Sequence, residues 1–307
     1  AISMARKNET VLLTGASGFL GSYTAEALTQ AGYHVKLFDR VESPYLCADQ
    51  EMIIGDITDL EAVKAAAQDC DYIYHMAGIA DIEECKTRPL DTGRVNLMGT
   101  LNALEAAVAH NIKRFVFAST VYVYSERGSF YRASKQACEN YIETYKSVHA
   151  LPFTILRYGS LYGRRAPETN GIHKLITSAM EKGEIVYYGD ENAMREYIHI
   201  SDAAQLSVDI LAPEYENRHI ILTGNERMRV TDIMRMIAEM LPNKPALKFG
   251  EEVMAGHYVM TPYNYNPRLG QKLVKPDHIE LGQGILDCID EIAHELSGEK
   301  RVGDRYE

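Results

Sequence analysis

The sequence lacks the features that mark membrane, secreted and nucleic-acid-binding proteins. No apolar run approaches the roughly 20 residues that a membrane-spanning helix needs, and no secretory signal is visible. The net charge of −11 comes without a cluster of basic residues, so nucleic acid is not an expected partner. We expect a cytoplasmic protein that binds neither nucleic acid nor membranes.

The sequence also lacks a pattern for disulfides or metal. Its five cysteines are scattered without a CxxC pair, which fits reduced thiols better than a disulfide framework or a zinc site. The ten histidines show no metal-ligand spacing. We therefore expect no metal centre.

What the sequence does contain is a regular alternation of short apolar runs and helical segments over 307 residues. This length suits a large α/β domain with a smaller lobe. Strand-helix alternation predicts a parallel sheet covered on both faces, in a Rossmann-type, doubly wound α/β fold. The runs that we interpret as buried strands are TVLLT, HVKLF, MIIGD, YIYHM, RFVFAS and FTILR.

A glycine-rich segment joins the first expected strand to the first expected helix. In VLLTGASGFLGSYTAEAL the spacing is GxxGxxG rather than the commoner GxGxxG. A tight turn and the close approach of a pyrophosphate both need residues without Cβ, and the helix N-terminus adds amide donors. A turn used only for packing is the alternative. The residues expected to bind a dinucleotide here are Gly15, Ser17, Gly18, Phe19 and Leu20.

Acidic residues at the ends of the next two strands indicate which dinucleotide binds. A carboxylate at Asp39 accepts hydrogen bonds from the adenosine ribose and repels a 2′-phosphate, which favours NAD over NADP. Arg40 is the opposing signal, because a guanidinium there binds a 2′-phosphate. Asp56 and Ile57 follow the third strand and are expected at the adenine; a turn or helix-capping aspartate is the alternative for Asp56.

Three tyrosines, Tyr122, Tyr124 and Tyr131, lie close in sequence to Lys135. If residues 131–149 form a helix, Tyr131 and Lys135 share one otherwise apolar stripe. Lys135 either snorkels to solvent or lies near Tyr131 and lowers the pKa of its phenol, normally about 10, so that it acts as a base. Tyr122 and Tyr124 have no lysine at this spacing. The hydroxyl of Thr120 is placed to share a hydrogen bond with the substrate oxygen.

Seven segments occur in an order that resembles a known family. They are TGASGFLG, GDITD, YHMAG, VNLMGT, FASTVYVYS, YRASK and LRYGSLYGRR. From Val11 to about Ile289 the chain resembles the extended short-chain dehydrogenase/reductases, in their NAD-dependent nucleotide-sugar epimerase/dehydratase group, which includes UDP-glucose 4-epimerase. The resemblance implies that Tyr131 is the catalytic base, with Thr120 and Lys135 as its partners. The further cofactor contacts that it implies are Ala77, Gly78, Asn96 and Ser119, beside Tyr131 and Lys135.

The chain departs from the family pattern at several positions. The link from Thr120 to Tyr131 is much shorter than in most members, which should reshape one wall of the substrate cleft. Ser160 and Arg164 stand where the family has asparagine and proline, and Ala80 stands where many 4-epimerases have lysine.

The residues after Thr120 bear on the type of reaction. The family's dehydratases carry acidic residues there and its decarboxylases a glutamate, whereas this chain has Val121 and Tyr122. The chemistry left is reversible hydride transfer with NAD. We therefore expect epimerisation of a nucleotide sugar through a keto intermediate. Among such reactions we favour UDP-hexose 4-epimerisation, because it is common in the family that the chain resembles. The alternatives are an NAD(P)-dependent reductase or dehydratase, or a non-catalytic NAD-binding regulator.

The second half of the chain resembles a sugar-nucleotide lobe. YYGDENAMREYIHISDAA is similar to a family segment in which Arg195 would meet the diphosphate; a surface ion pair with Glu196 or Asp190 is the alternative. The other residues expected at the substrate are Ser160, Arg165 and Arg268.

The expected organisation is an NAD-binding domain and a substrate-binding lobe. The expected boundaries are 5–160 for the domain, with strands returning to its sheet near 195–223 (YIHIS and HIILTG), and 161–194 with 224–296 for the lobe. Residues 1–3 are expected to be an expression scar and 297–307 a C-terminal tail. The helices expected at 99–111 and 131–149 match those of the family's two-fold dimer, so we expect a homodimer; covering the sheet is the alternative use of their apolar surface.

Overall fold

The computed structural model describes residues 8–125, 128–250 and 269–298. Within these residues the chain forms two compact units. The described residues of the first unit are 8–125, 128–158, 204–222 and 269–273. Those of the second unit are 159–203, 223–250 and 274–298. Each unit is described separately below.

The first unit is built on an eight-stranded sheet in the order β13-β10-β6-β5-β4-β1-β2-β3. All seven strand pairs are parallel, which confirms the predicted fold class. The strands are β1 Thr10–Thr14, β2 His34–Asp39, β3 Gln50–Ile54, β4 Tyr72–His75, β5 Arg114–Thr120, β6 Phe153–Tyr158, β10 Arg218–Leu222 and β13 Gln271–Lys272. The strand order reverses between β1 and β4, which is where doubly wound sheets bind ligands.

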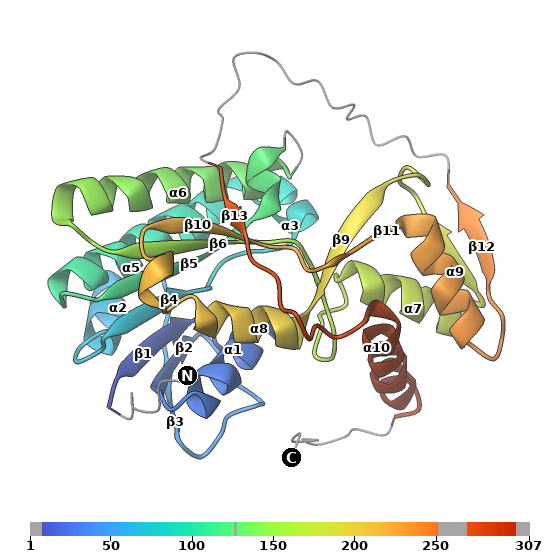
Figure 1. Cartoon of the computed structure of the whole chain (residues 1–307), viewed down its shortest axis with the longest axis horizontal. Coiled ribbons are helices and arrows are strands. Elements are labelled where there is room, and N and C mark those ends of the chain that lie inside the picture. The colour runs from blue at the N-terminus through green and yellow to red at the C-terminus, as the bar shows by residue number, and fades with distance from the viewer. Residues whose placement is uncertain (1–7, 126–127, 251–268, 299–307) are drawn as a thin grey trace, which may run out of the picture. The chain divides into compact units, whose positions relative to one another are not determined.

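Helices cover both faces of this sheet. Figure 1 shows α2, α5 and α6 on one face and α1 and α8 on the other. Their bounds are α1 Phe19–Gln30, α2 Leu60–Ala66, α5 Gly99–Ala109, α6 Ser129–His149 and α8 Ile200–Asp209. Shorter segments are α3 Ile82–Thr87, α4 Pro89–Thr92, the π-helix η1 Gly93–Met98, the 3₁₀ helix η2 Val121–Tyr124 and η3 Pro213–Tyr215.

The central strands owe their position to unbroken burial. Every residue of β5 and β6 is buried, as expected of parallel strands with helices on both faces. Residues such as Leu12, Ile73 and Phe115 pack with α2, α5 and α6 in one core cluster. This core fixes the strand ends from which the candidate site projects.

The second unit has two small sheets and its own core. The first contains β7 Ser160–Tyr162, β9 Met194–His199 and β11 Glu226–Arg229, and the second pairs β8 Glu184–Tyr187 with β12 Ala246–Phe249. The helices are α7 Gly171–Lys182, α9 Val230–Met240 and α10 Leu281–Leu296. Their apolar faces meet around buried residues such as Ile176, Ile237 and Ile285.

One of the two expected returning strands does not join the large sheet. HIILTG contributes to β10, which pairs with β6. The first three residues of YIHIS lie in β9, which pairs with β7 and β11, and the last two begin α8. The reason is that the chain leaves the large sheet at two adjacent points. A Cβ on Gly159 would lie 3.0 Å from the side chain of Thr223, so glycine eases this close approach. β7 begins at the next residue and offers β9 an edge.

None of the described helices combines the length and the apolar character needed to cross a membrane.

Candidate active site

The glycine loop is shaped by two glycines that packing requires. Gly15 has a φ of +70°, and a Cβ there would lie 2.6 Å from the backbone nitrogen of Ala77. A Cβ on Gly21 would lie 2.0 Å from the carbonyl oxygen of Gly15. Packing therefore requires glycine at these two positions, where β1, α1 and the residues after β4 approach one another closely.

The middle glycine, Gly18, is different, because a Cβ at this position would point into largely open space. A Cβ on Gly18 would meet only the carbonyl oxygen of Gly15, at 3.4 Å. Gly18 is the N-cap of α1 and provides no side-chain acceptor to the first turn. The amides at Phe19 and Leu20 begin the helix, where backbone N–H groups lack intrahelical acceptors and attract anions. The loop thus combines two glycines that close packing requires with an uncapped N-terminus of α1 that suits a pyrophosphate.

Asp39 lies directly beside this loop. Its carboxylate accepts hydrogen bonds from the backbone N–H groups of Ser17 at 3.0 Å and Arg40 at 2.7 Å. The Arg40 guanidinium is directed at Asp56, with 4.0 Å from Nε to Oδ2. Asp56 also forms the turn foreseen as its alternative role, accepting from the backbone N–H and hydroxyl of Thr58, and these bonds lower its pKa.

Asn96 fastens the segment that follows β4. Its side-chain oxygen accepts from the Ile79 N–H at 2.7 Å, and its amide donates to the Ile79 carbonyl and to the Ser134 hydroxyl. A Cβ on Gly78 would lie 3.0 Å from this oxygen and 3.7 Å from Nζ of Lys135. Asn96 belongs to the π-helix η1, a distortion often found at functional sites. The structure thus brings Gly78, Asn96 and Lys135 together.

The predicted catalytic residues also come together in the first unit. Tyr131 and Lys135 lie one turn apart on α6, and the Thr120 side chain at the end of β5 hydrogen-bonds the Tyr131 phenol. Nζ of Lys135 lies 5.7 Å from the Tyr131 ring centroid and donates to the Ala118 carbonyl at 2.9 Å. Only 6 % of Lys135 is exposed, so the snorkelling alternative is wrong.

The pKa of Tyr131 is shifted in the direction opposite to the one predicted. The pKa of Tyr131 is raised above its ordinary value, first by burial and then by the nearby Cys85, while the Thr120 hydrogen bond lowers it. Burial likewise lowers the pKa of Lys135. Burial disfavours the charged form of each group.

A buried ion pair behind the catalytic residues was not foreseen. Glu139 lies one turn beyond Lys135 on α6 and pairs with Arg157 of β6 at 2.6 Å, with side chains 2 % and 0 % exposed. Glu139 also accepts from the Ser119 hydroxyl at 2.6 Å, so the Ser119 side chain points to α6. The sequence signal available was a glutamate at helical spacing from Lys135 together with an arginine inside an apolar strand.

Tyr124 extends this cluster. Its hydroxyl accepts from the Arg157 guanidinium and, at 3.0 Å, from the backbone N–H of Gly270. The Arg157 guanidinium carbon also lies 4.8 Å from the Tyr124 ring centroid. The cluster of Ser119, Tyr124, Glu139 and Arg157 thus ties β5, η2, α6 and β6 together.

The residues expected at the substrate lie in the second unit. Arg195 sits on β9 opposite Met228, and its guanidinium donates to the Met194 carbonyl at 3.3 Å. It forms no ion pair with any residue that the structure describes, which leaves the surface-pair alternative without support. Ser160 begins β7 opposite Tyr197.

The arginine pair after β7 is engaged with α10. Arg165 has a φ of +71°, and its backbone N–H donates to both oxygens of Glu291, at 2.9 and 3.1 Å. Arg164 pairs with Asp290 at 3.0 Å. The fourth candidate, Arg268, lies outside the described residues.

Comparison with known proteins places the chain in a family. Residues 11–222 match the model of the NAD dependent epimerase/dehydratase family. The chain belongs to this family. The match spans the glycine loop, the Thr120–Tyr131–Lys135 set and β10, and it confirms the resemblance seen in the sequence.

Relatives within the family catalyse more than one reaction. Over 248 residues the chain is 25 % identical to a putative UDP-glucose 4-epimerase of Methanocaldococcus jannaschii, covering 74 % of this chain and 81 % of that protein. It is 29 % identical to a UDP-N-acetyl-alpha-D-glucosaminuronate decarboxylase of Bacillus cytotoxicus, over 70 % and 74 % of the two chains. The fold is similar to that of a UDP-N-acetylglucosamine 4-epimerase from Methanobrevibacter ruminantium M1, with a TM-score of 0.81, 22 % identity and coverage of 94 % and 99 %.

The described residues fit NAD, the cofactor of this family, as predicted. The helix end at Gly18 is open to a pyrophosphate. The Asp39 carboxylate is held by backbone N–H groups, and the nearby guanidinium of Arg40 is directed at Asp56. No group of three or more potential metal ligands occurs among the residues that the structure describes.

Proposed function

We propose that the chain is an NAD-dependent nucleotide-sugar epimerase, an isomerase acting on a UDP-hexose at C4. The observation that carries this proposal is the enclosed Thr120–Tyr131–Lys135 set, followed by η2, whose residues Val121 and Tyr122 carry no carboxylate. The family assignment and the names of its relatives support the same reaction class.

In the proposed reaction, side chains of this protein transfer one proton from the sugar and back to it. Tyr131 takes it from the sugar hydroxyl and returns it after the keto intermediate has turned over. Thr120, already hydrogen-bonded to the phenol, holds the reacting oxygen in place. The glycine loop and Asp39 would hold NAD, which would supply reversible hydride transfer at the sugar carbon. Because burial raises the pKa of Tyr131, its phenolate needs further positive charge near it, and the ammonium of Lys135 supplies one such charge.

Dehydration and decarboxylation are disfavoured by the same segment. Removal of water from the sugar needs a general acid and a general base beyond the tyrosine. Neither valine nor a tyrosine without a basic partner supplies them at the start of η2. The decarboxylase among the relatives makes this distinction worth a direct test.

In the second unit we propose Arg195 as the residue that binds the substrate diphosphate. Its side chain forms no ion pair with a described residue, and a guanidinium matches two phosphate oxygens at once. Ser160, Arg165 and Arg268 are proposed as further contacts. The backbone N–H of Arg165 already donates to Glu291 of α10.

The proposed enzyme is a cytoplasmic homodimer built through α5 and α6. Lys135, Cys138 and Ile142 on one face of α6 are buried, whereas Tyr141 and Val148 are 44 % and 68 % exposed. Pairing of this apolar surface would follow the two-fold geometry that is commonest among soluble oligomers.

The experiment is a product analysis. Purified protein with NAD should interconvert UDP-glucose and UDP-galactose, or their N-acetyl or carboxylate analogues, without net change in NADH absorbance. Release of carbon dioxide from UDP-glucuronate, formation of a stable 4-keto-6-deoxy sugar, or stoichiometric consumption of NADPH would each assign a different reaction.

A further inference from the structure

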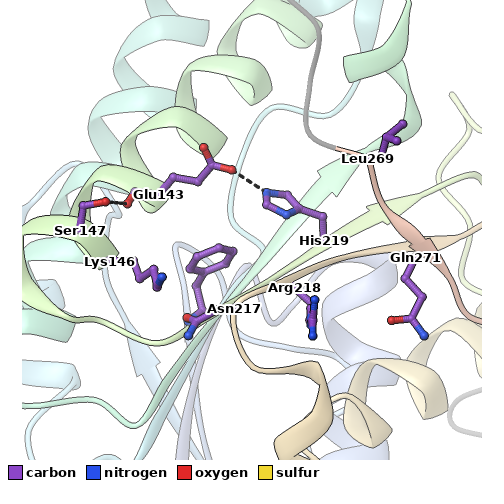
Figure 2. A pocket seen from close by; sticks show the side chains of 9 residues that line it. Glu143, Lys146, Ser147, Asn217, Arg218, His219, Leu269 and Gln271 are labelled. Atoms are coloured by element: carbon purple, nitrogen blue, oxygen red, sulfur yellow. Dashed lines mark hydrogen bonds and ion pairs between the residues drawn. The ribbon is translucent and has the colours of Figure 1, made fainter.

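A second pocket lies in the first unit away from the NAD residues. It has a volume of about 310 Å³ and lies where β6 and β10 begin, beside α6 and β13 (Figure 2). Phe153 is the first residue of β6 and Arg218 the first of β10. In a parallel sheet all carboxyl ends share one edge, and that edge carries Thr120 and the glycine loop. The pocket is therefore at the opposite edge.

Two uncompensated cations line this pocket. Lys146, in the last turn of α6, and Arg218 are both exposed, and their side chains form no hydrogen bond or ion pair with the residues that the structure describes. The acidic residue of the lining, Glu143, is already paired: its Oε1 lies 2.9 Å from Nε2 of the buried His219 (Figure 2). Since this pair occupies the carboxylate, the pocket keeps a local excess of positive charge.

Neutral donors add to these cations. The backbone N–H of Phe153 donates to Oδ1 of Asn217 at 3.1 Å, which fixes the amide so that its NH₂ group remains a donor. Asn217 is held there at a φ of +58°, with its own N–H bonded to the Phe153 carbonyl. The Gln271 amide supplies a second neutral group, and the Phe153 ring an apolar wall.

We propose that this pocket binds the phosphate group of a small phosphorylated compound. A guanidinium, an ammonium and amide donors together match the oxygens of a phosphate better than they match a neutral or cationic ligand. The volume lies at the lower end of the range of small-molecule sites, about 300–1,000 Å³. It leaves room for a phosphate and a group of roughly monosaccharide size against Phe153. The chain's net charge of −11 gives no general attraction for anions, so binding depends on these residues.

The test is calorimetric titration of the protein saturated with NAD and UDP, which fills the diphosphate-binding positions of the proposed active site. The titrants are α-D-glucose 1-phosphate, inorganic phosphate and glucose. Both phosphate compounds should bind and glucose should not. The Lys146→Gln/Arg218→Gln variant should bind glucose 1-phosphate at least tenfold more weakly. The control variant Lys174→Gln/Arg235→Gln removes two exposed charges from α7 and α9 and should bind like the parent.

Tighter binding of glucose 1-phosphate than of inorganic phosphate supports a phosphate ester as the ligand. Equal binding supports the phosphate site and assigns free phosphate to it. The proposal is overturned by the absence of binding by both phosphate compounds, or by equal weakening in the two double variants. If the Lys146/Arg218 double variant does not fold, each single variant should still weaken binding by severalfold, and unchanged binding in both overturns the site.

Discussion

At the scale of single residues, the proposed chemistry rests on Tyr131. Tyr131→Phe removes the group that carries the proton, and general acid–base help is worth about 10²–10⁴ in rate. We expect kcat to fall by this factor, with NAD affinity in calorimetry unchanged. Tyr122→Phe is the control, because Tyr122 has no lysine at helical spacing, and its kcat should stay within a few-fold of the parent's. Near-normal turnover in Tyr131→Phe would remove this residue from the mechanism.

The second prediction at this scale concerns the preference for NAD over NADP, which we expect Asp39 to set. Its carboxylate sits beside the loop, held by the N–H groups of Ser17 and Arg40, where it repels a 2′-phosphate. Asp39→Ala should narrow the preference for NAD over NADP at least tenfold, since it removes the negative charge that repels that phosphate. Calorimetry with both dinucleotides measures this. A parent protein that binds NADP more tightly than NAD would show that Arg40, not Asp39, sets the choice.

At the scale of elements, the cluster of buried Ser119, Glu139 and Arg157 with the more exposed Tyr124 holds α6 against β5 and β6. Glu139→Gln leaves Arg157 buried without a counter-charge, so we expect the free energy of unfolding to fall by about 3–5 kcal/mol. Tyr124→Phe removes one acceptor from Arg157 and should cost about 1–3 kcal/mol. Tyr141→Phe, on the exposed face of α6, is the control. Urea unfolding measures all three; a Glu139→Gln variant as stable as the parent would contradict this role.

The elements also show what a sequence can and cannot predict. The glycine loop, the strands and the Tyr131–Lys135 spacing are local patterns, and the structure contains them at the expected positions. The Glu139–Arg157 pair joins two elements, and neither residue signals its partner by spacing. The raised pKa of Tyr131 depends on how deeply it is enclosed, which no local pattern records. The prediction that YIHIS joins the large sheet is wrong, because apolar content predicts a strand but does not predict which strand it pairs with.

At the scale of the whole molecule, the proposed dimer makes a prediction about mass. If α5 and α6 pair across a two-fold axis, light scattering at micromolar concentration should report twice the mass of one chain. A charge at the exposed apolar position Val148, as in Val148→Glu, should shift the protein toward monomer. The same change at Leu296 of α10, which is also exposed but outside the proposed interface, should not. A parent protein that is only monomeric would contradict the proposal.

The short connection between Thr120 and Tyr131 concerns the substrate range of the whole enzyme. With fewer residues there, less protein covers the sugar, so we expect a pocket that tolerates an N-acetyl group or a carboxylate. Ser160, in place of the family's asparagine, would add room if it lines the same pocket. Room alone is not affinity, because an acetamido group also needs hydrogen-bond partners. Ser125, Ser129 and Arg127, which lies outside the described residues, are the polar residues of the connection.

Comparison of kcat/KM for UDP-glucose, UDP-N-acetylglucosamine and UDP-glucuronate measures this expectation. At least one substituted sugar should reach a kcat/KM within tenfold of that for UDP-glucose. Ser160→Asn, which restores the family residue, should lower kcat/KM for the substituted sugars more than for UDP-glucose. Turnover of the unsubstituted hexose alone would rule out the open pocket and leave the Thr120–Tyr131–Lys135 chemistry intact, because that set acts on the sugar hydroxyl and not on the substituent.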